Sequence, residues 1–229
     1  MGKIISLSGW AQPADALALA MPNAVAVDYA HFTSTDMLWR YLHSLGEIDG
    51  IVGWSFGGQL AARAVSQGAL QVKWLALLAA PYQFVSDGDV LAGMGPQTFH
   101  MFRENYVSNP QRTMKRFHGL ITKDDAHQRK IIAQLGYHSH VEEVDVWMPW
   151  LDNLARHSMD ECNLQHMPPT LLVQGENDAI VAPEQADRWA AMLPHAKVDM
   201  WSGCSHAPHL HAPSRMLQTL EKWHKQKAG

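Results

Sequence analysis

The sequence predicts an α/β fold, built on a mostly parallel, doubly wound sheet that carries an inserted helical lid. Three observations lead to this fold class. Short apolar segments recur without strict alternation, as expected of parallel strands that are buried on both faces. Helical segments fall between several of them, which is typical of a doubly wound sheet. One long stretch, residues 82–168, has no convincing strand and interrupts the alternation.

The predicted strands are bounded by Gly, Pro and Asp residues and cover residues 4–7, 24–27, 50–52, 74–78, 170–173 and 198–201. Helices are expected at residues 35–45, 56–66, 184–192 and 213–225. Residues 1–81 and 169–229 would then form the core, and residues 82–168 would form the lid.

Two helix starts are predicted inside the lid. Asn109 can cap a helix whose first residue is Pro110, because proline suits the first helical position. Thr122 and Asp125 have the spacing of a capping box for the next helix. That helix should end at Gly136.

Composition narrows the classes of function. The 229 residues suit one α/β domain, and 47% apolar residues allow a sizeable core. A formal net charge of −4 argues against general nucleic-acid binding. No apolar run approaches the ~20 residues that span a bilayer. Two cysteines cannot form a disulfide framework and no secretory signal is evident, so we expect a cytoplasmic protein.

The main candidate for chemistry is the segment Gly53-Trp54-Ser55-Phe56-Gly57. The pattern G-x-S-x-G is common by itself, and a glycine-rich turn with a surface serine is the alternative. A predicted strand before it and a predicted helix after it favour a nucleophile elbow with Ser55 as the nucleophile. The free N–H groups at the start of that helix would favour a nearby oxyanion.

A serine nucleophile needs a base and a group that orients the base. Asp178 follows the predicted strand 170–173, and His206 follows the predicted strand 198–201. Parallel strands end at the same edge of a sheet, so Ser55, Asp178 and His206 are expected to meet there as a catalytic triad. Each taken alone has an ordinary alternative, such as a turn residue or one surface histidine among 14.

The oxyanion hole should use the N–H of Phe56 and one N–H from the loop after the first strand. Trp10 is the candidate in that loop, and its indole could form a pocket wall or simply belong to the core.

Metal and nucleotide sites are not expected. His206, His209 and His211 form one histidine cluster, and His138 with His140 forms another. No carboxylate or cysteine was evident to complete either set, and Cys204 reads as a small packed residue. No phosphate-binding glycine motif occurs, so we predict no metal and no cofactor.

The helix that begins at Pro110 should have two faces. Met114, Phe117 and Ile121 form an apolar stripe with Leu120 beside it, which we expect to cover Ser55. A second face carries the basic residues Arg112, Lys115 and Arg116. That face is either an ordinary solvated surface or a docking site for an acidic partner.

The chain resembles the α/β-hydrolase superfamily and, within it, the pimeloyl-[acyl-carrier protein] methyl ester esterases of biotin synthesis. The residues that carry the resemblance are Gly9-Trp10, the elbow with Gly58, the lid run 112–120 and Ser205-His206-Ala207-Pro208. The chain departs from that pattern at Ser8, where a histidine usually stands, and at Ile121, where a polar residue is usual.

The resemblance implies a serine carboxylesterase with the triad Ser55, Asp178 and His206, needing no cofactor. It also implies an oxyanion hole at Trp10 and Phe56 and a contact between Phe117 and the acyl chain. We expect Trp10, Phe56, Leu120 and Ile121 to bind the substrate as well. Arg112, Lys115 and Arg116 would dock the acyl-carrier protein, and we expect a monomer that binds neither nucleic acid nor membrane. Two alternatives stay open: a general short-chain carboxylesterase or thioesterase without a carrier-protein partner, and a catalytically silent binding protein.

Overall fold

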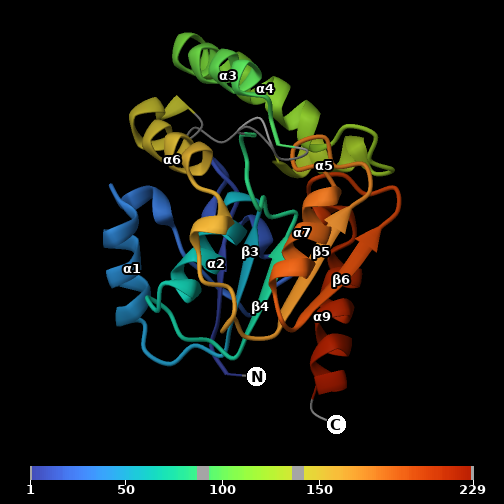
Figure 1. Ribbon diagram of the computed structural model, residues 1–229. Helices are drawn as coiled ribbons and strands as arrows, with labels where there is room; N and C mark the ends of the chain where they lie inside the picture. Colours follow the sequence, from blue (N-terminus) through green and yellow to red (C-terminus); the bar gives the residue numbers. More distant parts are fainter. Residues whose placement is uncertain (1, 87–92, 136–141, 228–229) are drawn as a thin grey trace.

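The fold is an α/β sheet with helices packed around it, as the sequence predicts (Figure 1). The computed structural model describes residues 2–86, 93–135 and 142–227. Among them, a six-stranded sheet has the order β2-β1-β3-β4-β5-β6, and every neighbouring pair is parallel. The strands are β1 Ile4–Leu7, β2 Val25–Ala26, β3 Gly50–Trp54, β4 Trp74–Leu78, β5 Thr170–Gly175 and β6 Ala196–Trp201.

The helices predicted beside the sheet are confirmed closely. They are α1 Thr35–Ser44, α2 Phe56–Ser66, α7 Glu184–Met192 and α9 Pro213–Lys227. The short helix α8, Pro208–His211, was not predicted. Short 3₁₀ turns cover Ala14–Leu17, Tyr29–His31 and Met159–Glu161. Strands β1, β3 and β4 are buried at every residue, which explains why they read as continuous apolar runs.

Residues 82–168, between β4 and β5, form what we call the insert, and the described part of this stretch contains four α-helices. They are α3 Pro96–Ser108, α4 Pro110–Ile121, α5 Gln128–Leu135 and α6 Val144–Arg156. In Figure 1 these helices lie above the end of the sheet to which the strand arrows point. The insert therefore covers the carboxyl edge of the sheet, where the predicted catalytic residues are placed.

The insert confirms one predicted helix start and corrects the other. The Asn109 side chain accepts a hydrogen bond from the N–H of Arg112 at 3.0 Å, and Pro110 opens α4. The predicted capping box is wrong, because the Thr122 hydroxyl donates back to the His118 carbonyl at 3.0 Å. Asp125 alone accepts from the next segment, through the N–H of His127 at 2.7 Å. The predicted stop at Gly136 lies outside the described residues.

Candidate active site

The backbone of Ser55 forms a sharp turn between β3 and α2. Its torsion angles are φ 53° and ψ −123°, a conformation that non-glycine residues rarely adopt. The Ser55 N–H donates to the Leu78 carbonyl at 2.8 Å, which ties the turn to β4. The turn is crowded, since a Cβ atom on Gly57 would lie 2.3 Å from the Leu7 carbonyl oxygen. The local sequence thus presents one serine on a strained elbow between a strand and a helix.

The side chains of Ser55, His206 and Asp178 form one hydrogen-bonded chain. The Ser55 Oγ lies 2.9 Å from His206 Nε2, and His206 Nδ1 lies 2.8 Å from Asp178 Oδ2. All three residues are buried, with His206 only 1% exposed. A neutral imidazole that donates through Nδ1 to the carboxylate leaves Nε2 to accept the serine proton. The arrangement can therefore activate a hydroxyl as a nucleophile.

Three donors besides His206 hold the Asp178 carboxylate. The N–H groups of Ile180 and Val181 both donate to Oδ1 at 2.9 Å, and Gln174 Nε2 donates to Oδ2 at 2.8 Å. These bonds satisfy a buried negative charge and fix its orientation toward the imidazole. The sequence reasoning missed Gln174. Its signal was present, since it is a polar residue that directly follows three apolar residues in a fully buried strand.

The loop that carries His206 packs closely on its neighbours. The Trp54 indole, directly before Ser55, donates to the His206 carbonyl at 2.7 Å and packs on the His209 ring at 4.4 Å. On the other side, a Cβ atom on Gly175 would lie 2.1 Å from the Ser205 carbonyl oxygen, so only glycine fits there. The close approach of these segments brings the ends of β3, β5 and β6 together.

The loop after β1 is held by the core and by the insert. The Tyr29 hydroxyl donates to the Gly9 carbonyl at 2.7 Å, and burial raises the pKa of Tyr29 well above its usual range, so it stays a donor. The Trp10 indole donates to the Trp147 carbonyl in α6 at 2.8 Å. It also packs edge-on against three rings of the insert, those of Phe102, Tyr106 and Phe117. Trp10 therefore joins the predicted oxyanion loop to the insert.

Phe56 is the first residue of α2, and its side chain is fully buried. N–H groups in the first turn of a helix have no intrahelical acceptor, so the N–H of Phe56 is suited to an oxyanion near Ser55. The loop after β1, which carries Trp10, is the predicted second part of the oxyanion hole. That loop and the elbow flank the point where the strand order changes direction, where open α/β sheets place ligands.

Helix α4 has the two faces that the sequence predicts. Met114, Phe117 and Ile121 are buried, whereas Arg112, Lys115 and Arg116 are exposed. Leu120 is 42% exposed and does not share the buried face. The structure thus gives an apolar surface that meets the predicted oxyanion loop through Phe117, and a basic surface that faces solvent.

The histidine cluster has a neighbour that the sequence did not reveal. Asp125, Cys204 and His211 place possible ligand atoms within 4.8 Å of one another. The expectation that no carboxylate or cysteine joins this cluster is therefore wrong. Asp125 could not be expected there from the sequence, because it comes from the distant insert. Its carboxylate already accepts from His127, Ser205 and His211. Burial raises the pKa of the Cys204 thiol, which disfavours a thiolate ligand. His138 and His140 lie outside the described residues.

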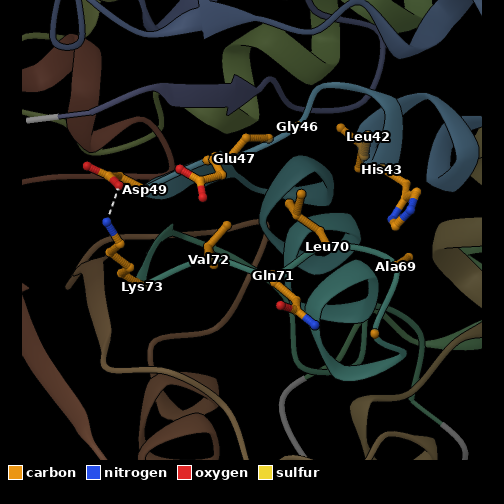
Figure 2. A pocket seen from close by; sticks show the side chains of 12 residues that line it. Leu42, His43, Gly46, Glu47, Asp49, Ala69, Leu70, Gln71, Val72 and Lys73 are labelled. Carbon is orange, nitrogen blue, oxygen red and sulfur yellow. Dashed lines mark hydrogen bonds and ion pairs between the residues drawn. The ribbon is translucent and has the colours of Figure 1, made fainter.

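A surface pocket of about 680 Å³ lies at the other end of the sheet. Ile48, Asp49, Val72 and Lys73 are among its lining residues, and Figure 2 shows Asp49 paired with Lys73 across 2.6 Å. These residues directly precede β3 and β4, whereas Ser55 follows β3. The pocket is therefore separate from the hydrogen-bonded chain of Ser55, His206 and Asp178.

Among the described residues, no helix combines the length and the apolar character needed to span a membrane.

Relatives with curated names are 25–29% identical to this chain over the aligned segments. A protein from Nitrosospira multiformis named pimeloyl-[acyl-carrier protein] methyl ester esterase is 28% identical over 83% of this chain and 73% of its own. A protein of the same name from Nitrosomonas europaea is 29% identical over 75% of this chain and 69% of its own. A biotin biosynthesis bifunctional protein from Cellvibrio japonicus is 25% identical over 76% of this chain, which spans only 35% of that protein.

Solved structures share the fold. An esterase from Exiguobacterium antarcticum superposes with a TM-score of 0.77 at 16% identity, over 98% of this chain and 92% of its own. A bromoperoxidase from Bacillus anthracis superposes with a TM-score of 0.78 at 16% identity, over the same shares of the two chains. A model of the family described as "Alpha/beta hydrolase family" matches residues 6–219, which include β3, β5 and β6 with the loops that follow them. By this match across most of its length, the chain belongs to the alpha/beta hydrolase family.

Proposed function

We propose that this protein is a serine carboxylesterase that hydrolyses the methyl ester of pimeloyl-[acyl-carrier protein] in biotin synthesis. The observation that carries the proposal is the hydrogen-bonded chain from Ser55 through His206 to Asp178, with distances of 2.9 and 2.8 Å. The class of substrate comes from the relatives named for that ester. In this proposal the enzyme acts as a cytoplasmic monomer.

The first half of the reaction forms an acyl-enzyme. Ser55 Oγ attacks the ester carbonyl while His206 Nε2 takes its proton, and Asp178 stabilises the resulting imidazolium. The N–H groups of Trp10 and Phe56 bind the negative oxygen of the tetrahedral intermediate. The imidazolium then returns the proton to the departing methoxy oxygen, and methanol leaves.

The second half restores the enzyme. Water attacks the acyl carbonyl, and His206 Nε2 takes its proton. When the second tetrahedral intermediate collapses, the proton passes from His206 to Ser55 Oγ, and the acyl group is released as a carboxylic acid that loses its remaining proton to solvent. No group beyond these residues is required for either half.

Helix α4 would provide the specificity. Phe117 and Ile121 on its buried face, with Trp10 and Phe56 beneath, would contact the acyl chain, and Leu120 would lie at the entrance. Arg112, Lys115 and Arg116 on its exposed face would attract an acidic carrier protein. In this proposal the insert, residues 82–168, acts as the lid of the site.

The test compares hydrolysis of methyl pimeloyl-carrier protein with hydrolysis of free dimethyl pimelate. The proposal expects a clearly higher kcat/KM for the carrier-linked ester. Equal values would contradict a carrier-protein substrate and leave a general short-chain carboxylesterase or thioesterase. Failure of a fluorophosphonate to label Ser55 would contradict catalysis altogether and leave a silent binding protein.

A further inference from the structure

The turn between α4 and α5 contacts both loops that carry the proposed catalytic base and acid. Ser205 Oγ and the His206 N–H both donate to the Ile121 carbonyl, at 2.8 and 3.1 Å. The Ala126 N–H donates to the Gly203 carbonyl at 2.9 Å. Beside Asp178, the Asn177 side chain donates to the Asp124 carbonyl at 2.7 Å. Residues 121–127, which we call the anchoring turn, thus bind the loops after β5 and β6 at once.

Asp125 is the centre of the anchoring turn. Its carboxylate is fully buried, and Oδ2 accepts from the N–H of Ser205 at 2.8 Å. Oδ1 accepts from His211 Nδ1 at 2.9 Å and from the N–H of His127 at 2.7 Å. Ser205 directly precedes His206, and His211 ends the short helix α8 that follows it. One carboxylate therefore holds the His206 loop on both sides of the histidine.

The position of His206 is demanding because its two nitrogens must reach two partners. Nε2 lies 2.9 Å from Ser55 Oγ, and Nδ1 lies 2.8 Å from Asp178 Oδ2. A catalytic base acts only within hydrogen-bond reach of the proton that it takes, and a displacement of about 1 Å can reduce the rate about a hundredfold. Ser55 lies directly after β3, and the Asp178 carboxylate is held by its own loop and by Gln174 of β5. The His206 loop is bonded to Trp54 and also to Ile121 and Asp125 of the insert.

We infer that Asp125 is a positioning residue for the reaction proposed above, since it fixes the loop of the catalytic base against the insert. The insert then does more than cover the substrate, because its anchoring turn helps to assemble the triad. This inference rests on the proposed function for its consequence in catalysis. Its structural part, the placement of His206 by a buried carboxylate of the insert, can be measured separately.

The test variant is Asp125→Asn. The amide offers one acceptor oxygen for three N–H donors, and its NH₂ would face a donor. We expect kcat for a small free p-nitrophenyl ester to fall about tenfold to a hundredfold, with a change in KM below about twofold. Asp124→Asn is the matched control, because this neighbouring side chain is exposed and its φ of 58° is accepted by asparagine. The control should keep the wild-type kcat.

A second readout follows His206 itself. The proton on Nδ1 that is shared with Asp178 should give a downfield NMR signal in the wild type and in Asp124→Asn, and Asp125→Asn should lose or shift it. If Asp125→Asn fails to fold, Ser205→Ala removes only the bond to the Ile121 carbonyl, and we expect a few-fold loss of kcat with a shifted signal.

A variant Asp125→Asn that melts earlier but keeps both kcat and the signal would overturn the inference and make Asp125 merely structural. A wild-type protein that shows the signal, loses it on Asp125→Asn and yet hydrolyses no ester would support the positioning role while contradicting the proposed function. The two failures are therefore distinguishable.

Discussion

The backbone of Ser55 is strained, and this strained conformation places its hydroxyl next to His206. Backbone conformations like its φ of 53° and ψ of −123° cost about 1–3 kcal/mol and persist only when the surroundings impose them. Here β3, α2 and the bond to the Leu78 carbonyl impose the turn. The result is a hydroxyl that meets His206 directly after the end of a fully buried strand.

Replacing Ser55 by Ala should abolish ester hydrolysis and leave the fold intact. The change removes one oxygen from a buried side chain, and a nucleophile of this kind supplies at least about 10³-fold of the acceleration. The measurement is kcat on purified protein, with circular dichroism to verify folding. A variant that kept a tenth of the wild-type rate would show that Ser55 is not the nucleophile.

Asp178→Asn should reduce kcat by up to about 10⁴-fold, because an amide can stabilise the wrong tautomer of the imidazole. Asp152→Asn and Asp199→Asn are the controls. Asp152 pairs with Arg103 in the insert at 2.7 Å, and Asp199 lies near Thr219 in α9 at 3.4 Å, so neither contacts His206. If Asp199→Asn were the damaging change, the assignment of the acid would be wrong.

Helix α4 shows how one element can serve two purposes. Its buried face packs Phe117 against Trp10, with ring centroids 5.9 Å apart, and its carboxyl end joins the anchoring turn. Its exposed face presents three basic side chains to solvent. Substitutions on the exposed face are therefore not expected to disturb the packing of Phe117 against Trp10.

The double substitution of Arg112 and Arg116 by Glu should reduce kcat/KM for a carrier-linked ester about tenfold to a hundredfold. Each exposed charge contributes ~1 kcal/mol, acts mainly on the association rate and is screened by salt. The loss should appear in KM, and the dependence of the rate on salt should weaken. A free ester needs no docking, so its kinetics are the internal control. Equal losses for both substrates would disprove docking on this face.

At the scale of the whole molecule, the site depends on segments far apart in the chain. Ser55 and His206 are 151 residues apart, and the sheet brings them together because its parallel strands all end at one edge. The same assembly buries His209 completely, and neither of its ring nitrogens has a hydrogen-bond partner among the described residues. Burial, and to a smaller degree the neighbouring His206, lowers the pKa of His209 to about 3.

This buried histidine should make the fold sensitive to acid. An unfolded histidine has a pKa of about 6.5, so between about pH 6.5 and pH 3 the unfolded chain binds a proton that the folded chain does not. The free energy of unfolding should therefore decrease as the pH falls through this window, by up to about 1.4 kcal/mol per pH unit for this one group.

His209→Leu should reduce the dependence of the unfolding free energy on pH by the equivalent of about one proton. The measurement is urea unfolding between about pH 4 and pH 6, which lies inside the window set by the two pKa values. The exposed His43→Gln is the control and should leave the slope unchanged. An unaltered slope in His209→Leu would show that His209 is not the group responsible.

Much of the fold could be predicted because its signals are local. Burial on both faces makes β1, β3 and β4 continuous apolar runs, and Asn109-Pro110 marks the start of α4 through bonds within one turn. The prediction at Thr122 and Asp125 failed for the opposite reason. Spacing along the chain suggested a cap, but the Asp125 carboxylate bonds mainly to Ser205 and His211, which no local pattern reveals.

The sequence by itself determined the order of strands and helices, the elbow at Ser55 and the placement of Asp178 and His206 just after strands, since each depends on neighbouring residues. Only the tertiary structure decided that Gln174 holds Asp178, that Trp10 joins the insert through the Trp147 carbonyl, and that Asp125 anchors the His206 loop. The latter two join residues 137 and 80 positions apart, and Gln174 reaches Asp178 only through the fold of its loop. Such bonds form where packing removes water from polar groups, which then must find partners within the fold.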